Sequence, residues 1–182
     1  MFNIFIDGKE GTTGLKIFER MAKRTDVAVR VLPEDLRKDP AARKACINEA
    51  DVVFLCLPDA AAKESVSLIE NDKVRIIDAS TAHRTAPDWA YGFPELSKAH
   101  EDKIRSSNRV AVPGCHASGF ISLVYPLIVG GFVEKDYPFV CHSVTGYSGG
   151  GKKMIAEYEA ENRAEEYESP RQYALTQNHK HL

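Results

Sequence analysis

The chain has 182 residues, of which 43% are hydrophobic and 27% charged, and 24 Lys and Arg against 26 Asp and Glu give a net charge of −2 with His neutral. This composition predicts a folded protein of one domain, or of one domain and part of a second, and excludes a disordered chain. The near-neutral charge offers no footprint for nucleic acid or a membrane surface, and no apolar run reaches the ~18 residues that cross a bilayer. We therefore expect neither nucleic-acid nor membrane partners.

The N-terminus and the cysteines favour a reducing cytoplasm. The first residues, MFNIFIDGKEG, contain neither a basic segment nor a small-residue cleavage site, so no secretory signal is expected. The four cysteines, Cys46, Cys56, Cys115 and Cys141, are too widely spaced for a metal site or a disulfide framework. We expect no bound metal.

The first half of the chain alternates strand-like and helix-like segments. The pattern predicts strands at 2–6, 27–32, 52–57 and 74–77, and helices through 15–22, 40–49 and 60–69. The run VVFLCL at 52–57 is apolar throughout, which is typical of a strand buried on both faces of a parallel sheet. Alternation at short spacing indicates right-handed βαβ units, so we expect a doubly wound α/β domain of the Rossmann type.

The second half has a different character. Its predicted segments are a structured loop at 79–95, a strand at 109–112, an apolar helix at 117–129, a strand at 139–144, a glycine-rich loop at 146–153 and a helix at 154–164. Pro126 should kink or end the apolar helix, because proline removes a backbone hydrogen bond. The acidic run 157–168 is expected to be a solvated helix face.

Three glycines separate the first predicted strand from the first predicted helix. Gly8, Gly11 and Gly14 form a G-x-x-G-x-x-G pattern that also contains Thr12 and Thr13. Backbone N–H groups at a helix N-terminus bind a pyrophosphate, and glycine lets the backbone approach it closely. We interpret the loop as a dinucleotide site. The alternative is a tight turn whose glycines serve only helix–strand packing.

The end of the second predicted strand bears on which dinucleotide binds. An NAD site commonly places an acid there to bind the ribose hydroxyls. Here the segment 30–33 reads RVLP, Glu34 and Asp35 follow only after the proline, and Arg30 and Arg37 lie nearby. This pattern favours the 2′-phosphate of NADP over NAD.

Cys115 follows a predicted strand and Pro113-Gly114, and it opens a predicted helix. The positive end of the helix dipole there favours the thiolate, and the first helical N–H groups can stabilise an oxyanion on an attacked carbonyl. The alternative is a structural cysteine, which suits Cys46, Cys56 and Cys141 better, because the last two lie in predicted apolar strands.

Two histidines near the end of the sequence are candidate acid–base groups. His179 and His181 are separated by one residue, so an extended backbone points both imidazoles to one side. Either would serve as acid or base beside Cys115. An exposed tail is the alternative. A metal site would need a third ligand, and the remaining histidines stand singly at 83, 100, 116 and 142.

Two further segments have the composition of anion sites. Ser148 and Gly149 lead through more glycines to Lys152 and Lys153, in the first turn of a predicted helix. Lysines oppose the helix dipole there, which makes sense if an anion binds, although a surface turn is an equal alternative. Arg84 follows a predicted strand and would hold a carboxylate or phosphate in bidentate fashion, or it lies on the surface.

Together these motifs resemble the N-acetyl-gamma-glutamyl-phosphate reductases, in particular their shorter bacterial subclass. The shared motifs are Gly8, Gly11 and Gly14, Leu57-Pro58-Asp59, Asp78-Ala79-Ser80 through Arg84, Tyr91-Gly92-Phe93-Pro94-Glu95, Pro113-Gly114-Cys115, Ser148-Gly149-Gly150-Gly151-Lys152 and His179-Lys180-His181. They span essentially the whole chain. Members of this family continue well beyond the position of Leu182, so this sequence lacks the C-terminal part of the family pattern.

The resemblance implies a domain order and a set of site residues. It implies an NADP-binding Rossmann-type domain over 1–112 and the start of an α+β catalytic or dimerisation domain over 113–182. The implied residues are Cys115 as nucleophile, His179 or His181 as acid–base partner, Gly8, Gly11, Thr12, Thr13, Gly14, Leu57 and Pro58 for NADPH, and Arg84, Ser148, Gly149 and Lys152 for substrate or phosphate.

The same resemblance implies a reaction and its partners. NADPH-dependent reduction of N-acetyl-gamma-glutamyl phosphate through a Cys115 thioester would give the 5-semialdehyde and phosphate, a step of arginine biosynthesis. The implied assembly is a homo-oligomer, a dimer or tetramer, in the cytoplasm.

Three other functions remain open. One is an acyl-phosphate reductase of the aspartate-semialdehyde-dehydrogenase kind, although there an Asn or Ser precedes the nucleophile where this chain has Gly114. Another is a non-catalytic dinucleotide-binding module in which Cys115 senses redox state. The third is a cysteine hydrolase, which would not need the glycine loop.

Overall fold

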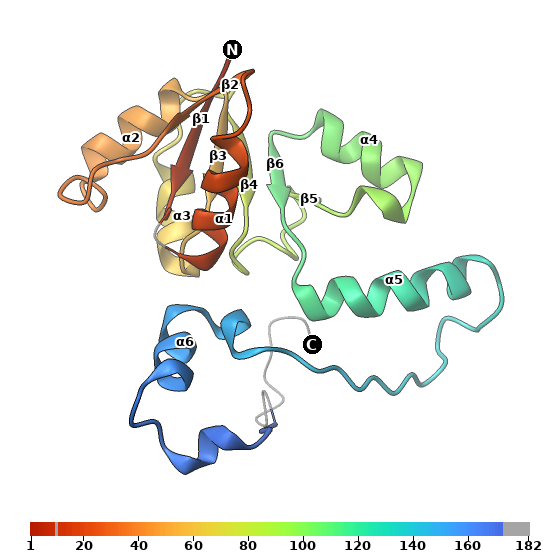
Figure 1. Cartoon of the computed structure of the whole chain (residues 1–182). Helices are drawn as coiled ribbons and strands as arrows, with labels where there is room; N and C mark the ends of the chain where they lie inside the picture. Colours follow the sequence, from red (N-terminus) through yellow and green to blue (C-terminus); the bar gives the residue numbers. More distant parts are fainter. Residues whose placement is uncertain (10, 173–182) are drawn as a thin grey trace. The chain divides into compact units, whose positions relative to one another are not determined.

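The computed structural model describes residues 1–9 and 11–172 (Figure 1). The chain divides into two compact units, Met1–Pro138 and Phe139–Leu182. The expected boundary between 112 and 113 lies within the first of these units, and it stays a prediction.

The first unit contains a parallel sheet of six strands with helices between them. Its elements are β1 (Phe2–Asp7), α1 (Thr12–Met21), β2 (Val27–Arg30), α2 (Pro40–Glu49), β3 (Val52–Leu55), α3 (Asp59–Ser67), β4 (Arg75–Asp78), β5 (Ala90–Tyr91), α4 (Lys98–Ser106), β6 (Arg109–Ala111) and α5 (Cys115–Val129). Neighbouring strands pair in parallel in the order β2-β1-β3-β4-β6-β5. The expected doubly wound sheet is therefore confirmed.

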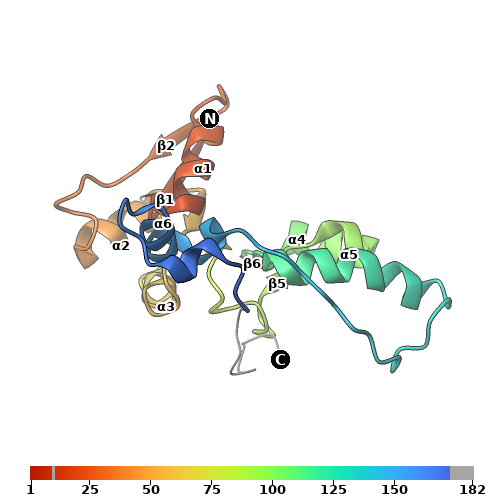
Figure 2. The same ribbon diagram turned by 60° about the horizontal axis from the view of Figure 1, so that its bottom comes forward.

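The strand order reverses at β1, because β2 lies on one side of it and β3 on the other. Right-handed crossovers then place α1 on one face of the sheet and α2 and α3 on the opposite face. Figure 2 shows this arrangement, with β1 between α1 and the other two helices. In sheets of this kind the ligand crevice lies outside the carboxyl ends of the strands at the reversal, here β1 and β3.

The core lies between the sheet and the helices α2 and α3. Strand side chains in this core include Phe5, Val53, Leu55 and Ile76, and they pack with helix residues that include Ile47 of α2. Val53, Leu55 and Ile47 have no exposed surface. This packing fixes the backbone from which the loops at the carboxyl edge of the sheet emerge.

The sequence predicts α2 correctly at both ends. Pro40 occupies the first turn, where its missing N–H costs nothing, and the Asp39 carboxylate caps the helix by accepting from the Ala42 N–H at 2.7 Å. α5 begins two residues before its predicted start and continues through Pro126 to Val129 instead of ending there. Proline near a helix end removes one hydrogen bond, and the last turn still closes through Gly130 N–H on the Pro126 carbonyl at 2.9 Å.

Two predictions about the second half are wrong. Residues 139–144 are not a strand, because every strand in the described part of the chain belongs to the sheet of the first unit and offers them no hydrogen-bonded neighbour. Val140 is accordingly 98% exposed. The loop predicted at 79–95 contains the short strand β5, and α4 follows it without having been predicted.

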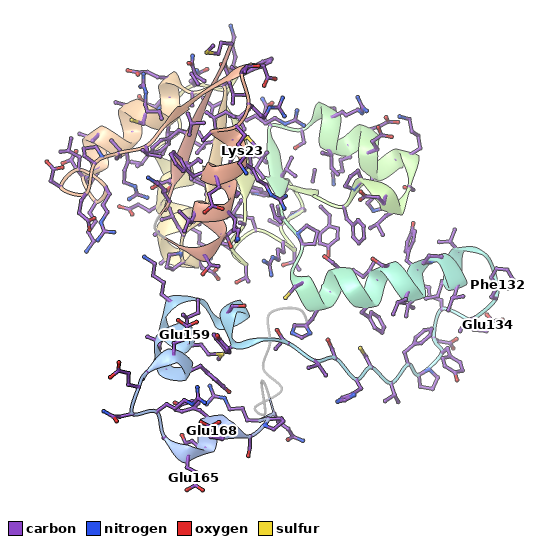
Figure 3. All side chains as sticks on the ribbon, viewed as in Figure 1. Lys23, Phe132, Glu134, Glu159, Glu165 and Glu168 are labelled. Carbon is purple, nitrogen blue, oxygen red and sulfur yellow. The ribbon has the colours of Figure 1, made fainter. Side chains whose placement is uncertain are left out.

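Over its described residues, 139–172, the second unit has one helix, α6 (Gly151–Glu159), between the 3-10 turns Tyr147–Gly150 and Glu165–Glu168. α6 starts three residues before the start of the predicted helix and ends five residues before the end of that helix. The acidic run is therefore not one helix face, although the side chains of Glu159, Glu165 and Glu168 do project from the ribbon into solvent (Figure 3). No helix in the described part of the chain has the length and apolar character needed to cross a bilayer.

Candidate active site

The loops that follow β1 and β3 touch each other at the reversal of strand order. Gly8 has φ +90°, and a Cβ there would lie 2.4 Å from the Cys56 carbonyl oxygen and 2.9 Å from Leu57 Cδ2. A Cβ on Gly14 would lie 2.3 Å from the Gly8 carbonyl oxygen. Only glycine fits either position, so Gly8 and Gly14 are required for β1, the β3 loop and α1 to approach this closely.

The N-terminus of α1 meets the requirements of a pyrophosphate site. The helix starts at Thr12 after Gly11, with no side-chain cap and no acid in its first turn. The first N–H groups of a helix have no partner within it, and the helix dipole attracts an anion to them. Thr12 and Thr13 are exposed on this turn. The residues present therefore fit a dinucleotide, and helix–strand packing alone does not require the open first turn.

A buried ion pair between Arg43 and Asp7 holds the carboxyl end of β1 against the neighbouring helices. Oδ2 of Asp7 accepts from the Ser65 hydroxyl at 2.8 Å and from Nη2 of Arg43 at 3.2 Å, and Arg43 also binds Glu64 at 2.8 Å. Burial raises the pKa of Asp7, against the lowering effects of Ser65 and Arg43. These contacts join α2 and α3 to the strand that carries the glycine loop.

Cys115 is the exposed thiol at the start of α5, after Gly114 as N-cap. The helix has no side-chain cap and no acid in its first turn, so nothing there opposes a thiolate or an oxyanion. The geometry therefore supports its expected role as nucleophile.

The other cysteines have different surroundings. Cys46 is buried. The pKa of Cys56 is raised to about 12, first by the burial of its own thiol and then by the charges of Asp7 and Asp78. Both fit the expected structural role. Cys141 was expected to lie inside an apolar strand, and this is wrong: it is exposed and belongs to the segment that forms no strand.

Arg84 is partly buried beside the turn that leads to Cys115. Its Nε donates to the Val112 carbonyl at 2.8 Å and its Nη2 donates to the Ala79 carbonyl at 3.3 Å. Burial lowers the pKa of Arg84, while Tyr91, Asp78 and Cys115 act in the opposite direction. This residue is therefore part of the structure around the thiol rather than a free surface arginine.

The sequence did not indicate a buried pair next to Arg84. His83 Nδ1 lies 2.6 Å from Oδ2 of Asp78, and the imidazole stacks on Trp89. Sequence spacing treats His83 as an isolated histidine. The available signal was an aspartate at the end of a predicted strand, five residues before a histidine in the same loop.

The second unit contains the glycine-rich loop. Ser148 and Gly149 lie in the 3-10 turn before α6, Gly151 has φ +74°, and Lys152 is exposed in the first turn of the helix. Tyr147 in this loop stacks on Tyr158 of α6, with ring centroids 5.0 Å apart. The helix start and the lysine are both open to an anion.

The structure gives little information on the predicted histidine pair and on metal binding. His179 and His181 lie outside the described residues, so their role stays a prediction. Over residues 1–9 and 11–172, no group of three or more His, Cys, Asp or Glu side chains is arranged to hold a metal ion.

Comparison with protein families identifies two matching models. "Semialdehyde dehydrogenase, NAD binding domain" matches residues 21–104. "Semialdehyde dehydrogenase, dimerisation domain" matches residues 115–182. Cys115 is the first residue of the second match.

Curated relatives named N-acetyl-gamma-glutamyl-phosphate reductase match nearly the whole chain. The protein of Chelativorans sp. (strain BNC1) is 50% identical over 98% of this chain and 57% of its own length. The protein of Sinorhizobium medicae is 49% identical, with 98% and 58% covered. This chain thus spans somewhat over half the length of these relatives.

Solved structures share the fold at low sequence identity. Aspartate semialdehyde dehydrogenase from Francisella tularensis superposes with a TM-score of 0.63 at 16% identity, covering 87% of this chain and 48% of that one. The aspartate semialdehyde dehydrogenase II of Vibrio cholerae gives a TM-score of 0.59, also at 16% identity, covering 87% and 50%.

Both family models and the curated relatives agree with the expected resemblance. On this evidence residues 21–104 and 115–182 match the two domain models of semialdehyde dehydrogenases, and the chain is similar in sequence to proteins named N-acetyl-gamma-glutamyl-phosphate reductase.

Proposed function

We propose that the protein reduces N-acetyl-gamma-glutamyl phosphate to N-acetyl-glutamate 5-semialdehyde and phosphate, with NADPH as reductant and Cys115 as nucleophile. The observation that carries the proposal is the exposed Cys115 thiol at the uncapped start of α5, on a sheet whose strand-order reversal carries a glycine loop. The identity of about half to the named reductases supplies the substrate class.

The residues proposed to hold the dinucleotide surround the reversal of strand order. Gly11, Thr12 and Thr13 supply the open helix start, while Gly8 and Gly14 allow the close packing that forms it. Leu57 and Pro58 border it from the β3 loop. NADPH, when bound, supplies the hydride that reduces the carbonyl carbon.

The preference for NADP rests on the end of β2. No acid ends this strand, whose last residue is Arg30, and the loop beyond it carries Arg37. Arg30 is ion-paired with Glu49, and Arg37 with Glu34 at 2.8 Å. We propose Arg37, in the loop after the carboxyl end of β2, as a cation for the 2′-phosphate, since exchange of one exposed ion pair for another has little cost.

Cys115 performs the covalent chemistry. Its thiolate attacks the acyl carbon, a C–S bond forms, and the C–O bond to phosphate breaks to leave a thioester and free phosphate. After reduction of that carbon, the C–S bond of the thiohemiacetal breaks, returning the thiolate and releasing the aldehyde. The N–H groups of the first turn of α5 are proposed to stabilise the oxygen that carries negative charge in both steps.

Proton transfer and anion binding involve further residues. His179 or His181 is proposed to accept the hydroxyl proton of the thiohemiacetal as it collapses. Arg84 is proposed to bind phosphate or the substrate carboxylate, and the same role is proposed for Ser148, Gly149 and Lys152.

The proposed assembly is a homo-oligomer whose only other partners are small molecules. The match to a model described as a dimerisation domain over residues 115–182 supports self-association. A catalytic thiol must stay reduced, so we propose the cytoplasm as its compartment.

The test is phosphate-dependent reduction of NADP with N-acetylglutamate semialdehyde, compared with aspartate semialdehyde. Cys115→Ala should abolish turnover and leave NADPH affinity, measured by titration calorimetry, within about twofold of the parent. Cys141→Ala, which removes the other exposed thiol, should retain turnover. A Cys115→Ala protein that turns over near the parent rate would refute the covalent mechanism, whereas NADPH binding without any turnover in the parent would favour a sensing module.

A further inference from the structure

A buried Asp–His–Trp cluster follows β4 and is not used by the proposed mechanism. Asp78 is completely buried and accepts from the N–H of Ser80 at 2.9 Å and from its hydroxyl at 2.8 Å. The same carboxylate binds His83 Nδ1 at 2.6 Å. The imidazole also lies flat on Trp89, with centroids 4.1 Å apart and planes 9° apart.

These contacts fix the histidine completely. A carboxylate only accepts hydrogen bonds, so Nδ1 carries the proton and the ring has one orientation about its axis. The indole fixes the plane of the ring. The segment between β4 and β5 contains neither helix nor strand, so such side-chain anchors decide the backbone path there.

The residue after the histidine touches the turn that carries the nucleophile. Nε of Arg84 donates to the Val112 carbonyl at 2.8 Å, three residues before Cys115. The Val112 N–H in turn donates to the Asp78 carbonyl at 2.8 Å. The buried cluster, the guanidinium and the turn therefore form one continuous set of contacts.

We propose that His83 is a positioning residue for the nucleophile. Held by Asp78 and Trp89, it fixes the backbone from which Arg84 extends. The guanidinium then stays against the turn before Cys115, where its positive charge stabilises the negative charge of the reacting sulfur. The inference rests on the proposed function, since only that function makes this thiol a nucleophile.

Thiol alkylation of the whole chain tests the proposal without requiring turnover. Iodoacetamide is applied at neutral pH and modification of Cys115 is followed by peptide-resolved mass spectrometry, with the exposed Cys141 as internal reference. His83→Phe keeps an aromatic ring for Trp89 but has no donor for Asp78, and Arg84→Gln removes the charge. Each should slow Cys115 roughly three- to tenfold and leave Cys141 unchanged.

Three comparisons separate positioning from a general structural role. His83→Asn places an amide donor near the position of Nδ1, and should restore most of the Cys115 rate. In the double variant His83→Phe with Arg84→Gln, Cys115 should be alkylated no more slowly than in Arg84→Gln alone, because His83 acts through Arg84. His100→Phe, the same substitution on α4, should leave the rate at its parent value.

The outcomes are distinguishable. If Cys115 of the parent reacts no faster than Cys141, the proposed nucleophile is wrong whatever His83 does. If Cys115 is reactive and His83→Phe reacts equally fast, the positioning role is refuted. At about pH 10, where thiols are ionised, the difference between parent and variant should close. A difference that persists there contradicts an effect through charge.

The experiment does not depend on one variant being folded. Should His83→Phe lose its cooperative thermal unfolding, His83→Ala takes its place, since it removes both contacts without burying an apolar ring against a carboxylate. The same loss of Cys115 reactivity is expected, and a parent-like rate in a folded His83→Ala protein would overturn the proposal.

Discussion

Gly8 combines a left-handed backbone with a close contact, and these two demands can be separated by experiment. Its φ is +90°, and an added Cβ would come within 2.4 Å of a backbone oxygen that cannot swing aside. Gly131, after α5, has φ +70° but nothing within 4 Å of its Cβ position. Gly8 and Gly131 thus share the left-handed backbone conformation, but only Gly8 has atoms close to the position of an added Cβ.

Gly131→Ala should therefore lower the free energy of unfolding by about 1–2 kcal/mol, the cost of a left-handed L-residue. Gly8→Ala should cost about 2–5 kcal/mol, because crowding adds to that strain, and should also weaken NADPH binding. Urea denaturation and titration calorimetry measure the two effects. An equal loss of free energy of unfolding in Gly8→Ala and Gly131→Ala would mean that the β3 loop moves to make room for the added Cβ. The close contact at Gly8 would then not contribute to the cost.

Single residues of the site differ in how far the sequence could predict them. Cys115 and the glycine loop were predictable, because strand, turn and helix start are adjacent in the chain. The Asp78–His83 pair was not, since nothing local shows that a loop histidine turns back onto a strand end. The exposure of Cys141 was missed because an apolar run was taken for a strand.

At the scale of elements, α2 and α3 are tied to β1 by a buried ion pair whose cost depends on pH. The side chains of Arg43 and Asp7 are 6% and 5% exposed, whereas those of the surface pair Arg30 and Glu49 are 55% and 59% exposed. Removing one partner of a buried pair leaves an uncompensated charge. Exposed pairs contribute little, since water and salt screen them.

Arg43→Leu should accordingly destabilise the protein by about 3–5 kcal/mol at neutral pH, and Arg30→Leu by no more than ~1 kcal/mol. Burial raises the pKa of Asp7 in the folded state. Folding therefore favours the protonated acid, and stability from this group is lost as the pH rises through the folded pKa. Without Arg43 this loss is larger, so the destabilisation should be smaller at about pH 4 than at neutral pH. Urea denaturation at both pH values measures it, and a pH-independent difference would be evidence against a charged Asp7.

The elements that the sequence predicted are those with local determinants. α2 has a capping aspartate and an initial proline, and β3 is an unbroken apolar run. α4 carries five basic and acidic residues among its nine, so no apolar period reveals it, although Ser97 caps it by accepting from the His100 N–H at 3.3 Å. The segment 139–144 has strand composition without a neighbouring strand, and pairing is a property of the fold rather than of the segment.

At the scale of the whole molecule, α5 and the turn after it leave large apolar side chains uncovered. Leu123 is 74% exposed and Phe132, at the end of this region in Figure 3, is 79% exposed. Both lie in the part of the chain that matches the dimerisation-domain model. Apolar side chains that gather on one surface are typical of association sites, so the proposed self-association should depend on them.

Leu123→Glu and Phe132→Glu should each shift the chain towards the monomer, since a carboxylate placed in an apolar interface must lose its hydration. Light scattering coupled to size-exclusion chromatography, over a range of protein concentrations, measures the shift. Leu36→Glu is the control, because Leu36 is also an exposed leucine but lies outside residues 115–182. If both glutamate variants keep the oligomeric state of the parent, association does not use this surface. If Leu36→Glu disrupts it equally, the added charge rather than its position is responsible.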